Sequence, residues 1–390
     1  MKSKAKIKIS KVLRTVTAAE AVPFHLRNSL KYTTGQFETV VVGTEVERLK
    51  DQFPAVRFIN AYIPRKISFI KDLWGLIQLI LIIGREKPDV THSIMPKSGL
   101  LTAIAAFICC VPVRMHTFTG QRWTNYTGVK RKFFIFLDKI VVALNTYCLT
   151  DSSSQSKYLL DNGIHFKDLA LPILGKGSLG GVDFEVFNVQ NLHAVSTKHR
   201  QELNLGPDNF VFIFVGRKCY DKGVFELIDA FELVNDEKAR LILVGPDESN
   251  GSLEKRIFSK VQILNLPQTD LPHLYLSLAD VFCLPSYREG FGSTVIEAAA
   301  LGLPTIGTQI AGLKDSVIDG QTGILVPPQN VKELAHAMRT LLQNEALRKK
   351  MSAAALENAR KNYDAKTLAA EMVKIYQDQF KEQFEKSRLF

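Results

Sequence analysis

The sequence lacks several features that would assign it to a particular class of protein. Its five cysteines form no C-x-x-C pair and no metal-ligand spacing, and this odd, scattered set argues for buried thiols in a reducing compartment. No G-x-x-x-x-G-K-[ST] loop is present, so an ATPase would have no phosphate cradle. Its apolar runs are shorter than the ~20 residues that cross a bilayer, and no signal peptide is expected at the basic N-terminus.

Positive charge is concentrated in the first 150 residues. That part holds 23 Lys and Arg against 9 Asp and Glu, whereas the remainder holds 27 against 30, and the net charge is +11. A basic half can attract nucleic acid, an anionic membrane surface or an anionic substrate. Because no zinc spacing, recognition-motif aromatics or Arg-rich run is present, no nucleic-acid partner is expected. We favour an anionic membrane surface or lipid phosphate, with a surface tuned for solubility as the alternative.

Two apolar runs require an interpretation, Leu73–Ile83 and Gly99–Val113. Both are too short to span a bilayer, so we interpret them as core helices. Lys71 and Arg85 flank the first run, and a helix that dips into a membrane surface therefore remains the alternative.

Short apolar segments alternate with helical segments in two successive series. This alternation predicts an α/β protein with two tandem Rossmann-like, doubly wound domains, an interdomain cleft and a C-terminal helical tail. We place the N-terminal domain at residues 1–183 and the C-terminal domain at 184–370, with a polar stretch to about residue 207 after the boundary. The helix at 371–390 is expected to return to the first domain. Strands are predicted at 12–16, 39–42, 56–59, 89–92, 113–116, 147–150, 211–215, 239–244, 261–264, 281–284, 304–306 and 323–326.

A glycine-bearing loop joins the predicted strand at 281–284 to a helix, and residues 285–298 read P-S-Y-R-E-G-F-G-S-T-V-I-E-A. The first turn of a helix offers free N–H groups and a positive dipole end, which suit a phosphate. Glu289 in the loop can reach a sugar hydroxyl, and Glu297 inside the helix can accept two hydroxyls of a ribose. The alternative is a helix whose acidic residues complement its dipole.

Two cations stand beside glycines after the predicted strand at 211–215. Arg217 and Lys222 can neutralise a diphosphate and stabilise it as a leaving group, although an ordinary loop with surface cations would look similar. The segment Gly175–Gly180 also matches G-x-G-x-x-G. No helix opens after it, so we interpret it as interdomain turn backbone.

Together these segments closely resemble glycosyltransferase family 4, whose members are retaining, nucleotide-sugar-dependent enzymes of the GT-B fold. The resemblance spans most of residues 170–345 and rests on Gly216–Gly223, on Glu289–Gly307 and on Gly320–Pro327. A weaker pattern at 88–117 resembles bacterial transferases that build surface polysaccharides, such as the N-acetylfucosamine transferases of capsule and O-antigen pathways.

The resemblance implies that the domain at 1–183 binds the acceptor and the domain at 184–370 binds the nucleotide sugar. It also implies a role for each candidate residue. Glu289 would bind the donor sugar and Glu297 the ribose, while Arg217 and Lys222 would bind the diphosphate. His116, at the end of a predicted strand, would lie near the sugar and the acceptor. Further donor contacts would come from Gly216, Gly290, Phe291, Gly292, Ser293 and Thr294. The segment Thr17–His25 lacks the glycines that many family members carry there, so acceptor contacts can come from side chains such as that of His25.

The implied protein is a cytoplasmic glycosyltransferase, peripherally associated with the inner face of the membrane. It would move a sugar, with an N-acetylated amino sugar as one candidate, from a UDP-linked donor to a lipid-linked or oligosaccharide acceptor. Because the leaving diphosphate can take the acceptor's proton, no protein base is strictly required, and no metal or cofactor is expected. Two alternatives stay open: a glycosidase that uses Glu289 and Glu297 as acid and nucleophile, and a catalytically silent partner subunit that binds nucleotide and membrane.

Overall fold

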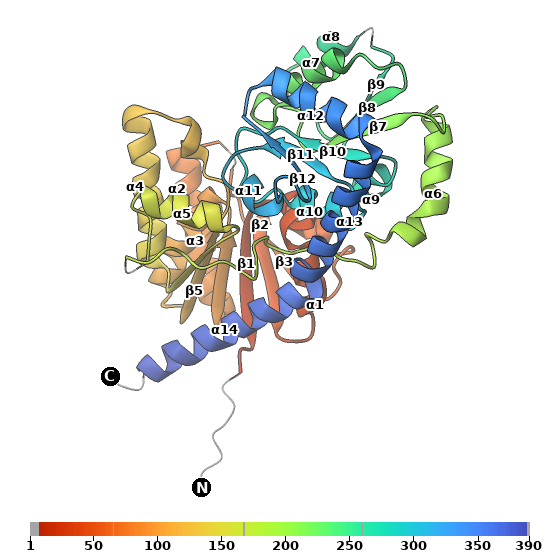
Figure 1. The fold of residues 1–390 in the computed structure, drawn as a ribbon. Coiled ribbons are helices and arrows are strands. Elements are labelled where there is room, and N and C mark those ends of the chain that lie inside the picture. The colour runs from red at the N-terminus through yellow and green to blue at the C-terminus, as the bar shows by residue number, and fades with distance from the viewer. Residues whose placement is uncertain (1–7, 65, 167, 259, 388–390) are drawn as a thin grey trace. The chain divides into compact units, whose positions relative to one another are not determined.

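The computed structural model describes residues 8–387 except 65, 167 and 259, and divides into two compact units (Figure 1). Unit 1 contains Met1–Gly180 and Ala365–Phe390, and unit 2 contains Gly181–Asp364. The sequence places these divisions after residues 183 and 370. The second differs because helix α14, Ala365–Ser387, is continuous from its first residue and belongs to unit 1. Val182 N donates to Tyr363 O at 2.7 Å, so the chain enters and leaves unit 2 side by side.

Unit 1 is built on a six-stranded parallel sheet in the order β3-β2-β1-β4-β5-β6. Five residues of β2 and all five of β4 are buried, as expected for strands covered on both faces. All six predicted strands of this series are confirmed, within three residues at each end. The strands are β1 Lys11–Ala18, β2 Glu38–Thr44, β3 Arg57–Asn60, β4 Val90–Ile94, β5 Val113–Phe118 and β6 Tyr147–Thr150.

Helices cover both faces of this sheet. Leu13 of β1 packs in a cluster with Leu79 and Leu101, from α2 and α3, whereas its neighbour Val12 packs with Leu368 and other residues of α14. Successive side chains of a strand point to opposite faces, so α14 covers the face opposite α2 and α3. α3 contacts both α2 and α4, which places these three helices in one row. The helices are α1 Arg27–Thr33, α2 Phe69–Glu86, α3 Pro96–Ile108, α4 Gly128–Leu144, α5 Ser153–Asp161 and α14.

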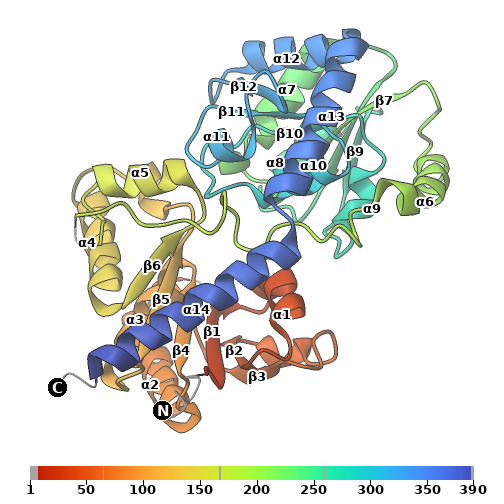
Figure 2. The ribbon, with the colours of Figure 1, turned by 60° about the horizontal axis from the view of Figure 1, so that its bottom comes forward.

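α14 runs across the sheet of unit 1 (Figure 2), and a buried chain of hydrogen bonds anchors it there. Arg14 Nη1 donates to Tyr376 OH at 3.0 Å, and this hydroxyl lies 2.6 Å from His92 Nδ1. Because a guanidinium can only donate, the hydroxyl oxygen of Tyr376 accepts from Arg14. The other ring nitrogen of His92, Nε2, lies 2.8 Å from Thr117 Oγ1. Burial, and next the charge of Arg14, hold the pKa of His92 well below its usual value, so the ring is neutral.

We expect Tyr376→Phe to destabilise the protein by about 1–3 kcal/mol, because it removes the hydroxyl that contacts the buried His92 Nδ1 and one of the two acceptors of Arg14 Nη1. The urea midpoint of unfolding measures this loss. Tyr62→Phe, which removes a hydroxyl from a side chain that is 40% exposed, should change the free energy of unfolding by no more than about 0.5 kcal/mol. Equal midpoints for both variants would show that the chain of hydrogen bonds contributes nothing.

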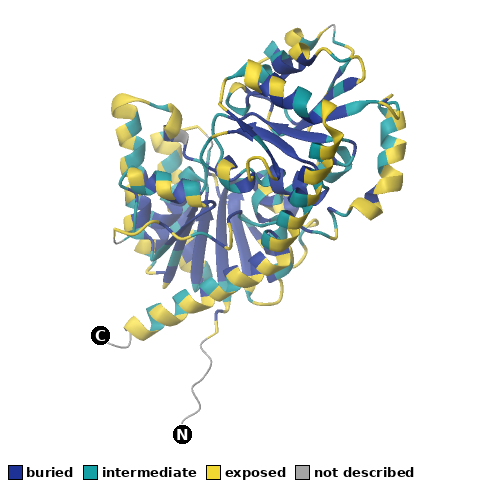
Figure 3. Ribbon diagram, in the orientation of Figure 1, coloured by how far each residue is buried: buried dark blue, intermediate teal, exposed yellow. Residues whose placement is uncertain are grey.

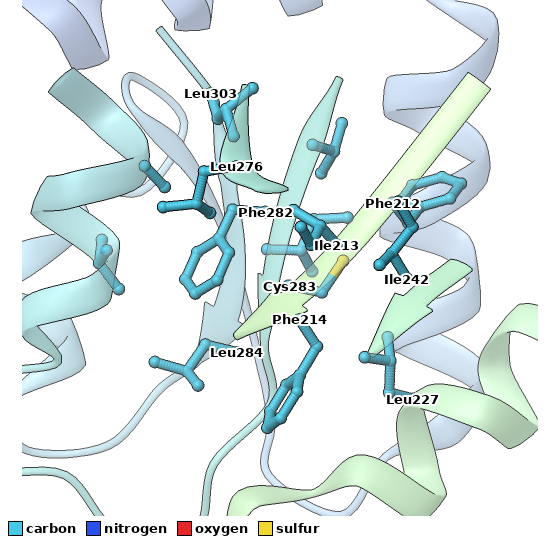
Figure 4. Packing of buried hydrophobic residues seen from close by; sticks show 14 of the residues in the cluster. Phe212, Ile213, Phe214, Leu227, Ile242, Leu276, Phe282, Cys283, Leu284 and Leu303 are labelled. Atoms are coloured by element: carbon cyan, nitrogen blue, oxygen red, sulfur yellow. The ribbon is translucent and has the colours of Figure 1, made fainter. Parts of the chain in front are cut away.

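Unit 2 repeats the same sheet architecture, with all strands parallel and the order β12-β11-β10-β7-β8-β9. Numbered within their own unit, both sheets have the Rossmann order 3-2-1-4-5-6. Its core is formed by side chains such as Phe212, Phe214 and Phe282, each below 1% exposed (Figure 4). The strands are β7 Phe210–Val215, β8 Ala239–Val244, β9 Ile263–Leu266, β10 Val281–Leu284, β11 Thr305–Thr308 and β12 Gly323–Val326. The predicted strands are confirmed, with β9 shifted by two residues.

The helices of unit 2 surround this sheet. The stretch after the domain boundary is polar, as predicted, but it contains a helix that was not predicted. This helix is α6, in which only Leu192 is buried. The C-terminal tail is helical, as predicted, and it is interrupted where one helix ends at Asn362 and the next begins at Ala365. The helices are α6 Val189–Glu202, α7 Val224–Val234, α8 Ser252–Ile257, α9 Pro272–Leu276, α10 Ser293–Ala300, α11 Leu313–Ser316, α12 Val331–Gln343 and α13 Glu345–Asn362.

Two further expectations concern burial. Cys148, Cys219 and Cys283 are buried, but Cys110 is exposed and Cys109 is half-buried, so the expectation of buried thiols is wrong for these two. They follow the last turn of α3, where the chain leaves the core. None of the helices that the structure describes is both long and apolar enough to cross a membrane.

Candidate functional site

In the sheet of unit 2, the order in which the chain adds strands reverses between β7 and β10. These strands are hydrogen-bonded neighbours, yet the chain continues from β7 to β8 and β9 on one side and from β10 to β11 and β12 on the other. The loops that leave their carboxyl ends therefore diverge, and ligands of open α/β sheets bind at such a switch point. The candidate site consists of these two loops, residues 216–223 and 285–292, and the start of α10.

Lys222 and Glu289 form an ion pair that joins the two loops. Lys222 Nζ lies 2.5 Å from Glu289 Oε1, and the two side chains are only 17% and 12% exposed. Ser286 Oγ donates to the same carboxylate oxygen at 2.8 Å. Two predicted site residues that are 67 positions apart in the sequence are thus in direct contact.

Arg217, the other predicted cation, is more exposed and lies among acidic side chains. Its Nη1 lies 2.6 Å from Glu248 Oε2 and its Nη2 lies 3.6 Å from Asp221 Oδ2. Arg288 Nη2 approaches the same Asp221 oxygen at 3.4 Å. Burial alone would raise the pKa of the Asp221 carboxyl, but a hydrogen bond from Cys219 and the neighbouring cations hold it below its usual value. Asp221 is therefore an anion that organises the site's cations.

The two loops pack backbone against backbone at Gly223. This residue has φ +68°, and a Cβ there would lie 2.0 Å from Pro285 O. Asp221 O also accepts from Tyr287 N at 2.9 Å. Only glycine fits this approach, because a side chain would meet backbone rather than a flexible group. The position of Lys222 relative to the second loop therefore depends on the glycine that follows it.

α10 begins directly after the second loop. Gly292 caps it with φ +81°, and no Asp or Glu occupies its first turn. Glu297 is the fifth residue of the helix, beyond the first turn, so it does not act as the dipole-complementing residue of the alternative interpretation. Phe291 is 2% exposed and its ring meets that of Tyr363 edge to face at 5.4 Å. The Phe291 side chain therefore packs in the hydrophobic core of unit 2.

Lys218 ties the first loop to the end of β9. Its ammonium donates to Asn265 Oδ1 at 2.6 Å and to Leu266 O at 2.8 Å. Burial lowers the pKa of Lys218, and the charge of Asp247 opposes that shift. The end of β9 is thus held by a buried cation from the loop that carries Arg217.

His116 lies in unit 1, inside β5 and two residues before its end, rather than at the strand end that the sequence predicts. Its ring is enclosed: Nδ1 is 2.9 Å from Ser93 Oγ, and Phe118 meets the ring edge to face at 4.5 Å. A Cβ at Gly99 would lie 2.4 Å from the ring. Burial lowers the pKa of His116 to about 3, so it is a neutral core residue here.

The structure therefore brings the predicted residues of unit 2 to one edge of its sheet. Sequence reasoning missed the roles of Asp221, Glu248 and Arg288, although two of them directly adjoin predicted residues. Arg288 directly precedes Glu289, so the charged pair in this loop was a signal for it. Its partner Asp221 is 67 positions away in the sequence, so the contact itself could not be predicted. Within the described part of the chain, no group of three His, Cys, Asp or Glu side chains is arranged to hold a metal ion.

Comparison with known proteins places this geometry in context. The family described as glycosyl transferases group 1 matches residues 195–358. The chain is 28% identical to the capsular polysaccharide biosynthesis glycosyltransferase CapM of Staphylococcus aureus, over 96% of this chain and 99% of that one. It is 30% identical to a D-inositol 3-phosphate glycosyltransferase of Pseudarthrobacter chlorophenolicus, over 76% and 73%. It is 26% identical to the Escherichia coli UDP-Gal:alpha-D-GlcNAc-diphosphoundecaprenol alpha-1,3-galactosyltransferase, over 80% and 82%.

A solved structure has the same fold. The crystal structure of Anabaena HepE in complex with UDP and glucose superposes with a TM-score of 0.77, covering 94% of this chain and 99% of that one at 17% identity. At this level of identity the likeness shows the fold alone. That fold is the two-domain GT-B architecture, and the two Rossmann-type sheets of this chain are its two domains.

Proposed function

The chain belongs to the group 1 glycosyltransferases, and from this membership we propose that it moves a sugar from a UDP-linked donor to a lipid-linked or oligosaccharide acceptor, with retention of configuration. We further propose that the product is part of a capsule or another surface polysaccharide. The similarity to CapM over nearly the whole of both chains supports the pathway. The donor and acceptor in the name of the Escherichia coli relative support both a UDP-linked donor and a diphospholipid acceptor.

One observation carries the proposal: cations from the two loops meet at the switch point of unit 2, beside the start of α10. A nucleotide sugar presents a diphosphate with a sugar on one side and a ribose on the other. Lys222 and Arg217 would neutralise the diphosphate, and the amides from Gly290 to Ser293 would extend this cradle. Glu297, on α10, would accept the ribose hydroxyls.

Glu289 has the geometry of a residue that orients the donor sugar. Its Oε1 accepts from both Lys222 and Ser286, which fixes the carboxylate in place. We propose that Oε2 accepts a hydroxyl of the sugar. The same ion pair would hold Lys222 where the leaving diphosphate accumulates charge, so that sugar and leaving group are positioned by one contact.

The proposed reaction is a displacement on one face of the sugar. The bond between the anomeric carbon and the diphosphate oxygen breaks, and a bond to the acceptor oxygen forms on the same side. The acceptor's proton goes to the departing diphosphate oxygen. Lys222 and Arg217 stabilise the charge that develops there, without a metal or a protein base. We propose that unit 1 binds the acceptor and that the protein works at the cytoplasmic side of a membrane.

We expect UDP to stabilise the protein against thermal unfolding. At about 100-fold its dissociation constant, a ligand of the native state adds about 2.7 kcal/mol, which differential scanning fluorimetry resolves. Uridine should shift the melting temperature much less, because it lacks the diphosphate that Lys222 and Arg217 would bind. Equal shifts with UDP and uridine would contradict the diphosphate assignment. No shift with any nucleoside diphosphate or nucleotide sugar would contradict the donor site itself.

Turnover distinguishes the remaining alternatives. A transferase releases UDP from the donor only as the sugar reaches an acceptor or water. Hydrolysis of an activated aryl glycoside without any nucleotide would instead favour a glycosidase that uses Glu289 and Glu297. Binding of a donor with no turnover on any acceptor would favour a silent partner subunit.

A further inference from the structure

α2 presents apolar side chains on two opposite sides. Gly75, Leu79 and Ile83 are its buried residues. Figure 3 shows exposed stretches, in yellow, on the helices of unit 1. Large apolar residues of α2 are among the exposed ones, with Phe69 84% and Ile70 80% exposed. At about 100° per residue, all six of them fall within a sector of about 140° that points away from the buried three. The six are Phe69, Ile70, Leu73, Trp74, Ile77 and Leu81.

α4 repeats this arrangement in the same helix row. Val129, Phe133 and Phe136 are 84%, 53% and 57% exposed, and their spacing places them on one side of the helix. Its buried Val141 and Val142 pack in the core below. Both outward stripes therefore belong to the layer of helices on one face of the unit 1 sheet. We call these nine residues the α2–α4 face.

The charge around the α2–α4 face is of one sign. Exposed basic residues flank both stripes, whereas each carboxylate of α2 and α4 is already engaged and α3 has none. Asp72 Oδ1 lies 2.6 Å from Lys97 Nζ, Glu86 pairs with Arg57 and with Lys11, and Asp138 is buried and accepts from Trp123. The flanking basic residues are Lys66, Lys71, Arg85, Lys130, Lys132 and Lys139.

We propose that the α2–α4 face docks onto an anionic lipid bilayer, with its aromatic and aliphatic side chains at the acyl boundary and its lysines among lipid phosphates. Apolar stripes bordered by lysines, without available carboxylates, match a negatively charged interface. A second copy of the chain fits less well, because pairing two such faces would bring like charges together. The inference rests on the proposed function in one respect: a membrane is where a lipid-linked acceptor would be met.

Trp74 makes the test specific. The chain has two tryptophans: Trp123 is 1% exposed and Trp74, inside the face, is 54% exposed. Flotation with phosphatidylglycerol vesicles should recover the protein, and phosphatidylcholine vesicles should recover at least tenfold less. Doxyl-labelled lipid in the phosphatidylglycerol vesicles should quench Trp74 fluorescence, and Trp74→Phe should abolish this response. Added salt should weaken binding only in part, because insertion of apolar side chains is not screened.

Matched variants locate the surface. Phe69→Ser/Ile70→Ser on α2 and Phe133→Ser/Phe136→Ser on α4 should each lower vesicle binding at least tenfold. Phe258→Ser/Val261→Ser removes two residues of unit 2 that are 90% and 93% exposed, and it should bind like the unaltered protein. All variants should keep the UDP-induced thermal shift, which reports the donor site independently.

Three results would overturn the inference. They are no vesicle binding by the unaltered protein, undiminished binding by both the α2 and the α4 double variants, and a dimer in solution that these double variants convert to monomer. In each case a retained UDP shift would leave the proposed function standing. Loss of the UDP shift with intact vesicle binding would contradict the proposed function alone.

Discussion

Lys222→Ala and Glu289→Ala should each lower kcat about 100- to 1000-fold, the effect of removing one preorganised group that stabilises charge in the transition state. The ion pair between the two side chains explains why either change has this effect. Without Lys222 the leaving diphosphate loses a cation, and without Glu289 both the donor sugar and the ammonium lose their fixed position. The measurement is the initial rate of UDP release at saturating donor and acceptor.

A double variant separates catalysis from folding. Each single change leaves one largely buried charge without its partner, which costs stability. Lys222→Ala/Glu289→Ala removes both charges, so its urea midpoint should be at least as high as that of the less stable single variant, while its kcat should stay as low. Lys349→Ala disrupts an exposed pair with Glu345 on α13 and should change the free energy of unfolding by about 0–1 kcal/mol and leave kcat unchanged. Near-normal turnover in both single variants would refute the site assignment.

Gly223→Ala should destabilise the protein by about 2–5 kcal/mol: about 1–2 for a non-glycine residue at positive φ and about 1–3 for the overlap with the loop after β10. The added methyl carbon would lie 2.0 Å from Pro285 O, and neither backbone can yield without moving Lys222. Turnover should therefore fall together with stability. The urea midpoint and kcat are measured on the same preparation.

Gly251→Ala is the matched control for this variant. Gly251 has a similar φ of +79°, but no other described atom would lie within 4 Å of its new Cβ. It should therefore cost only the about 1–2 kcal/mol of the backbone conformation and leave turnover intact. If Gly223→Ala and Gly251→Ala were equally stable and equally active, close packing of the two loops at Gly223 would contribute neither to stability nor to turnover.

The fold could be predicted from the sequence because its strands are buried on both faces. Such strands appear as short, continuous apolar runs, and those at 211–215 and 281–284 are examples that the structure reproduces within one residue. α4 and α6 could not be predicted in this way. α6 buries a single residue, and α4 exposes part of its apolar side, so neither has the one-sided pattern that identifies a helix on a core.

The site was predictable only in its residue types. A glycine-bearing loop between a strand and a helix, with nearby cations and two glutamates, identifies the chemistry of Glu289 and Lys222. It does not reveal that these side chains contact each other, nor that Asp221 is shared by Arg217 and Arg288, since such contacts depend on the tertiary fold. His116 is the opposite case, because a histidine near a strand end looks accessible in sequence while α3 and Phe118 enclose it.

The position of the two crossings between the units has a consequence for how such a protein can change over evolution. Val182 and Tyr363 are hydrogen-bonded partners, so everything between them is a cassette whose ends coincide in space. Insertion or replacement of such a cassette needs no rerouting of the host chain. A lineage could thus exchange unit 2, for which we propose the donor site, while the half that carries α14 keeps its own sheet and its own outer surface.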